Sequence, residues 1–169
     1  MYLKLKHLVL TSFIIIACSS FSAVAQQSKF EDWVRICEEK GAFSGRCYIS
    51  QRLTLKDTGA DLFSLGIGYP LENKHPLMLL SAPLGIFLPS GIKFSVDSLQ
   101  EVTSVVAYCN KAGCHAYYRM TANLIKEFRQ GRWINVTFLD GTRKPHHFQV
   151  SLNGFTSAIA SLSNISISE

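Results

Sequence analysis

The chain has 169 residues, of which 47% are hydrophobic, and a formal net charge of +5 at pH 7. A single chain of this length can bury a sizeable core, so one domain is expected. The basic residues are scattered along the sequence and form no dense run, which argues against a nucleic-acid-binding protein.

The first 25 residues have the pattern of a secretory signal peptide. Lys4 and Lys6 give a basic start, residues 8–17 form an apolar run, and Ala23-Val24-Ala25 supplies small residues before a cleavage site. The run is shorter than the roughly 20 residues that a membrane-spanning helix needs. We therefore expect cleavage after Ala25 and no transmembrane segment in the mature chain. An uncleaved anchor and lipidation at Cys18 stay open as alternatives.

Residues 26–169 are then expected to form one exported domain, in the periplasm or on the outer surface, or secreted. Loss of two lysines and no acidic residue lowers the net charge from +5 to +3. Attraction to an anionic surface is compatible with this charge.

Four cysteines remain after cleavage: Cys37, Cys47, Cys109 and Cys114. An even number in an exported chain favours disulfides, and the spacing favours Cys37–Cys47 and Cys109–Cys114. A zinc site that includes His115 is the rival interpretation, but the spacings match no usual structural zinc pattern. A redox-active cysteine pair would need the spacing Cys-x-x-Cys, which these cysteines lack. We expect no metal and no cofactor.

Strand-like patterns, rich in β-branched and aromatic residues and separated by turns, follow one another along the mature chain. They cover residues 29–37, 46–55, 62–70, 77–81, 92–96, a hairpin over 102–118, 133–139 and 146–152. Gly66 and Gly68 fit no dinucleotide fingerprint, and we expect them to mark a bulge or a close backbone approach. The apolar residues 84–88 are interpreted as core; a membrane-inserting loop is the alternative.

Two short helices are predicted. Thr121 is a suitable N-cap, apolar residues follow at helical spacing, and Gly131 is a stop. A second helix is expected within residues 154–162. The fold class is therefore all-β, an immunoglobulin-like or related β-sandwich with one or two short peripheral helices.

No catalytic residues are predicted. The sequence contains no Gly-x-Ser-x-Gly and no His-Glu-x-x-His motif. His146 and His147 are adjacent, so in a strand they point to opposite faces. A hydrolase assembled from distant residues, with His115, His146 or His147 in one cleft, stays an alternative.

The order of these features along the chain resembles the invasion-associated locus B family of exported bacterial proteins. The matching positions are Phe30, Asp32, Trp33, Cys37-Glu38, Cys47, Gln51, Pro83-Leu84-Gly85, Leu88, Gly91, Cys109, Gly113-Cys114-x-Ala116 and Ser151-Leu152-x-Gly154-Phe155. The resemblance covers residues 30–162. It implies a compact β-sandwich in the periplasm or on the outer surface, and some members are linked to entry of pathogens into host cells.

The resemblance implies a non-enzymatic envelope or secreted protein that aids host-cell association or entry. A periplasmic envelope-maintenance module, which affects invasion indirectly, is the second hypothesis, and a hydrolase is the third. The partner is expected to be a protein or a glycan, on the host cell or in the bacterial envelope. The sequence does not identify surface recognition residues.

Overall fold

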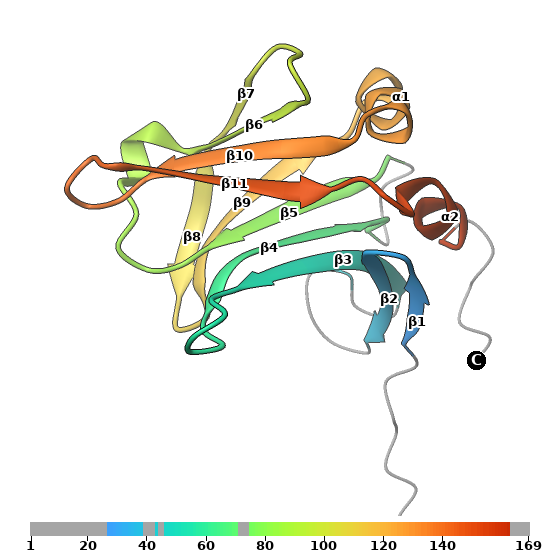
Figure 1. Ribbon diagram of the computed structural model, residues 1–169, viewed down its shortest axis with the longest axis horizontal. Coiled ribbons are helices and arrows are strands. Elements are labelled where there is room, and N and C mark those ends of the chain that lie inside the picture. The colour runs from blue at the N-terminus through green and yellow to red at the C-terminus, as the bar shows by residue number, and fades with distance from the viewer. Residues whose placement is uncertain (1–26, 39–42, 44–45, 71–74, 163–169) are drawn as a thin grey trace, which may run out of the picture.

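Two antiparallel sheets face each other in the computed structural model, which describes residues 27–38, 43, 46–70 and 75–162 (Figure 1). The larger sheet contains β1 (Ser28–Phe30), β2 (Trp33–Glu38), β3 (Arg46–Thr54), β4 (Asp61–Gly68), β5 (Leu77–Ala82), β9 (Gly113–Arg119) and β8 (Val106–Asn110), in that spatial order. The smaller sheet contains β11 (Pro145–Ser151), β10 (Trp133–Leu139), β6 (Ile92–Val96) and β7 (Val102–Ser104). The predicted all-β sandwich is confirmed.

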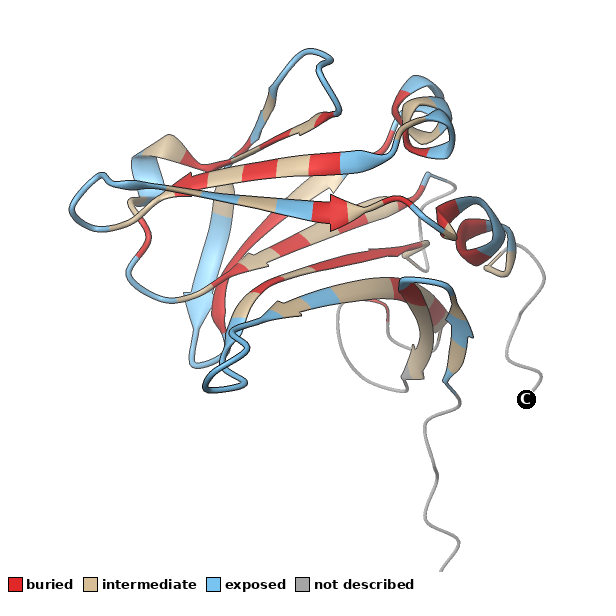
Figure 2. Ribbon diagram, in the orientation of Figure 1, coloured by how far each residue is buried: buried red, intermediate tan, exposed pale blue. Residues whose placement is uncertain are grey.

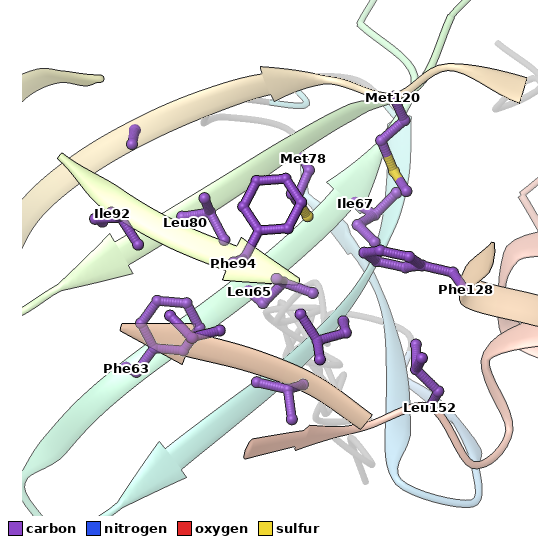
Figure 3. Packing of buried hydrophobic residues seen from close by; sticks show 14 of the residues in the cluster. Phe63, Leu65, Ile67, Met78, Leu80, Ile92, Phe94, Met120, Phe128 and Leu152 are labelled. Atoms are coloured by element: carbon purple, nitrogen blue, oxygen red, sulfur yellow. The ribbon is translucent and has the colours of Figure 1, made fainter. Parts of the chain in front are cut away.

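Alternation along the strands places the core between the sheets (Figure 2). Side chains from both sheets meet there, including Phe63 and Leu80 from the larger sheet and Phe94 from the smaller one (Figure 3). Trp33 is fully buried, and its ring lies edge-on to Phe155 with 5.3 Å between ring centroids. It is thus a core anchor.

Two helices, α1 (Ala122–Gln130) and α2 (Phe155–Ala160), lie at one end of the sandwich, on the right in Figure 1. The Thr121 hydroxyl accepts a hydrogen bond from the Leu124 amide at 3.2 Å, which confirms the predicted N-cap. Gly154 precedes α2 with φ +85°, and a Cβ there would collide with the Phe30 carbonyl oxygen. Only glycine fits this position without strain.

The disulfides pair as the spacing favours. Cys37 bonds to Cys47 across β2 and β3, and Cys109 bonds to Cys114 across β8 and β9. Each bridge therefore lies within one pair of neighbouring strands. The expected signal peptide and Cys18 lie outside the described residues.

Two strand predictions need correction. Residues 29–37 form two strands, because Glu31 adopts φ +52° and the chain turns between β1 and β2. The hairpin predicted over residues 102–118 is divided at Val105, so that β7 joins the smaller sheet while β8 pairs with β9 in the larger one. Ser104, buried at this switch, donates a hydrogen bond to the Tyr117 carbonyl oxygen at 3.0 Å.

The interpretation of residues 84–88 as core is correct only for Ile86. Leu84 is 60% exposed and Leu88, which begins a 3₁₀ turn η1 (Leu88–Ser90), is 49% exposed. The segment crosses from one sheet to the other, and Ile86 bridges to Asp140 on the way. Phe87 is half-buried, whereas Leu84, Gly85 and Leu88 face solvent. In the described part of the chain, no helix is long and apolar enough to cross a membrane.

Candidate functional site: the outer face of the seven-stranded sheet

A hollow of about 530 Å³ lies on the outer face of the seven-stranded sheet, the face turned away from the core. This volume is in the range of ligand pockets. It is lined by Gln27, Asp32, Val34, Ile36, Phe43, Tyr48, Ser50, Gln51, Arg52, Ser64, Gly66, Leu79 and Ser81. Most of these residues come from β2 to β5.

The strand register places the floor residues in two rows that run across the sheet. Ser50 is opposite Gly66, which is opposite Leu79. In the next row Ser64 is opposite Ser81, and Ser81 is opposite His115. Residues directly opposite in antiparallel strands share a face. Because serine has a small side chain and glycine has none, the surface of the sheet is recessed at these positions.

An aromatic pair stands beside this floor. The Phe43 and Tyr48 rings stack with 5.0 Å between centroids. A Cβ on Gly68 would lie 2.7 Å from the Phe43 ring, so the absence of a side chain lets the ring approach the strand. A close approach is thus found at Gly68, where it involves an aromatic side chain; a Cβ on Gly66 would make only ordinary contacts, the nearest at 3.5 Å.

Two hydroxyl groups on the floor are available for a ligand. Among the described residues, neither the Ser50 nor the Ser64 hydroxyl has a hydrogen-bond partner. The nearby guanidinium of Arg52 lies 3.0 Å from the Asp61 carboxylate, and both side chains are largely exposed. Such an exposed pair adds little stability, but it balances the positive charge of Arg52.

His115 lies at the edge of this face and is nearly fully buried. Its Nδ1 is 2.9 Å from the Ser81 hydroxyl, and its Nε2 is 3.3 Å from Asn110 Oδ1, which also accepts from the Ala112 amide. Burial lowers the pKa of His115. The neutral ring therefore accepts from Ser81 and donates to Asn110.

One tyrosine packs on this histidine and contacts a second tyrosine. The Tyr108 ring packs on His115 with 4.8 Å between centroids, and its hydroxyl lies 3.3 Å from that of Tyr117. Burial, together with the Tyr108 hydroxyl, raises the pKa of Tyr117 to about 12. The Tyr117 phenol is thus uncharged at neutral pH.

Ser81, His115 and Asn110 have the connectivity of a nucleophile, a base and an orienting group. Ser81, however, lies within an interior strand, and its neighbours β4 and β9 pair with it on both sides. The amides of β5 are therefore engaged in sheet pairing, and a backbone oxyanion hole of the usual kind cannot form around Ser81. We interpret the cluster as a structural polar network.

The other two histidines lie in the smaller sheet. His146 Nε2 is 2.9 Å from Asp140 Oδ2, and His147 Nδ1 is 2.9 Å from the Thr137 hydroxyl. The structure does not bring them together with His115, because both lie in β11 of the smaller sheet whereas His115 lies in β9 of the larger one. No group of three potential metal-binding side chains occurs among the described residues.

Asp140 organises the turn between β10 and β11. Hydrogen bonds from the Thr142 hydroxyl, His146 and the Lys144 amide hold the pKa of Asp140 well below its usual range. The Arg143 guanidinium lies 5.0 Å from the centroid of the Phe87 ring, which joins this turn to the crossover between the sheets. These contacts account for the conformation of the turn, and we assign no ligand to it.

Sequence reasoning did not find the hollow. The available pattern was the set of small polar residues Ser50, Ser64 and Ser81, which alternate with apolar residues of the core in three successive strands. Because the strand register was unknown, nothing in the sequence showed that these serines share one face.

The fold and this face define a class: a disulfide-linked antiparallel β-sandwich with an exposed hollow on its larger sheet. The family model described as Invasion associated locus B (IalB) protein matches residues 33–163, and the chain belongs to this family.

A solved relative has the same fold. The crystal structure of invasion associated protein B from Bartonella henselae matches with a TM-score of 0.71 and 18% sequence identity, over 82% of this chain and 96% of that chain. Comparison with curated proteins gives no match.

Proposed function

We propose that this chain is an exported, non-enzymatic binding protein that aids association of the bacterium with host cells. Membership of the invasion-associated family carries the proposal. Two disulfides support export, since such bonds persist mainly in oxidising compartments. Residues 1–25 act as a cleaved signal peptide, and residues 26–169 form the mature domain.

The described surface suits a binding role. The hollow offers unpartnered hydroxyls and apolar side chains on a rigid sheet, while the Ser81–His115–Asn110 cluster is held in a structural network. A rigid, preformed surface lowers the entropy cost of binding.

Export is tested by fractionating the source bacterium and treating intact cells with protease. We expect the mature protein, with Gln26 as its first residue by mass spectrometry, to be shaved from intact cells or found in the medium. The Ala25→Arg variant, which places a large charged residue at the cleavage site, should accumulate as the precursor. Detection of only full-length protein in the cytoplasm would contradict export.

Host association is tested separately, with a deletion strain and its complemented parent on cultured host cells. We expect deletion to reduce the number of bound bacteria and complementation to restore it. Protection from protease until the outer membrane is opened, together with unchanged adhesion, would instead favour the envelope-maintenance role.

A further inference from the structure

We propose that the hollow on the seven-stranded sheet binds a neutral oligosaccharide. This inference rests on the proposed function as a binding protein and names the ligand class of that site. Three observations carry it: free hydroxyl groups on the floor, an apolar wall beside them, and no unpaired positive charge among the described lining residues.

Hydroxyl groups are the first observation. The side chains of Ser50 and Ser64 have no partner among the described residues, and each can both donate and accept. The hydroxyl of Ser81 donates to His115, and its oxygen can still accept from a ligand in the hollow that Ser81 lines. A sugar also presents groups that donate and accept, so it can satisfy all three serines at once.

The apolar wall is the second observation. Val34, Ile36 and Leu79 line the hollow together with the stacked rings of Phe43 and Tyr48. A pyranose ring has C–H faces that are apolar and an edge that carries its hydroxyls. Such a ring can bury a C–H face against this wall while its edge reaches the serine floor.

Charge is the third observation. Among the described residues that line the hollow, Asp32 and Arg52 are charged, and Arg52 is already paired with Asp61. A polyanion would meet no unpaired positive charge among these residues and would be repelled by the Asp32 carboxylate, so a neutral ligand fits better than an anionic one.

An extended peptide fits less well than a sugar. Strand addition, a common way of binding peptides, needs an open sheet edge with free backbone groups. The floor strands β3, β4 and β5 each have a neighbour on both sides, so their amides and carbonyls are used within the sheet. Recognition here must come from side chains, which suits a ligand covered with hydroxyls.

The ligand has two possible sources, the bacterial wall and the host surface, which share neutral pyranose chemistry. Two defined probes distinguish them: a linear tetramer of N-acetylglucosamine for the wall, and a neutral oligomer of N-acetyllactosamine for the host. Titration of the mature, disulfide-bonded protein by calorimetry and by amide NMR shifts measures affinity and location. We expect saturable binding of at least one probe, with shifts centred on Ser50, Ser64 and Leu79.

Variants test the site. Replacing Ser50 and Ser64 together with alanine should weaken binding roughly tenfold or more, because two hydrogen bonds are lost. Ser64→Leu should abolish binding by filling the floor. The matched control is Ser95→Ala, a serine at a half-buried strand position in the smaller sheet, which should bind like the parent. Melting temperatures verify that each variant is folded.

Three outcomes overturn the assignment: the folded parent binds neither probe, both hollow variants bind like the parent, or the shifts map to another face. None of them affects the proposed function, because fractionation and host adhesion are measured without any sugar. Conversely, loss of adhesion on deletion supports the function even when no probe binds.

Discussion

Trp33 offers the sharpest test of how the core is held together. Its indole N–H donates to the Ser151 carbonyl oxygen at 3.1 Å, and its ring packs against Phe155. Trp33→Phe keeps an aromatic ring and removes the donor. The Ser151 carbonyl still accepts from Gln51, so no buried acceptor is left without a partner.

The loss of stability expected for Trp33→Phe has two parts. Loss of the hydrogen bond costs about 1 kcal/mol. The smaller ring leaves roughly 40 Å³ unfilled, which at about 24 cal/mol per Å³ costs about 1 kcal/mol more. Together these predict a free energy of unfolding lowered by about 2 kcal/mol and a Tm lowered by roughly 6–8 °C.

Trp133 is the matched control, because it is 42% exposed and is the other tryptophan of the chain. Trp133→Phe should change stability by no more than about 0.5 kcal/mol. It also leaves Trp33 as the single tryptophan, whose emission should be blue-shifted and resist quenching by acrylamide. Equal stability losses in the two variants, by urea unfolding, would refute the reasoning.

The remaining predictions concern the bridges, a buried histidine and a glycine. Replacing Cys109 and Cys114 together with alanine should lower stability by about 2 kcal/mol, and the melting temperature of this variant should respond less to reductant than that of the parent. Because burial lowers the pKa of His115 below its ordinary 6.5, the unfolded chain binds more protons below that pH, so stability should fall on acidification. Urea midpoints at pH 7.5 and 5.0 measure this fall, and the part due to this residue disappears in His115→Gln; an identical fall in both proteins would contradict the assignment. Gly154→Ala should lower the melting temperature more than Gly59→Ala, since both have positive φ but only Gly154 faces a close backbone oxygen.

Local patterns predicted most of the elements, and long-range geometry accounts for what they missed. The Thr121 cap and the cysteine spacings are local features, and the structure places α1 and both disulfides where they indicated. The break at Val105 depends on which sheet each half joins, and the exposure of Leu84 depends on a crossover. Neither is encoded in the periodicity of the residues themselves.

The candidate site also combines features that local sequence predicts with features that depend on long-range geometry. Disulfide cysteines were identified from spacing, whereas the hollow required the register of β3, β4 and β5. A shift of one residue in any of these strands would turn its serine toward the core, so the site exists only as a property of the paired sheet.

The switch of the chain at Val105 has a mechanical consequence. On either side of Val105 the chain forms β7, an edge strand of the smaller sheet, and β8, an edge strand of the larger one. Ser104 donates a hydrogen bond across to β9. A force that slides one sheet past the other must therefore stretch this covalent link before the core can shear. It must also stretch the crossover through Ile86, which ends beside the switch, where Ile92 pairs with Ser104. Such an arrangement resists a lateral load that is applied across the two sheets.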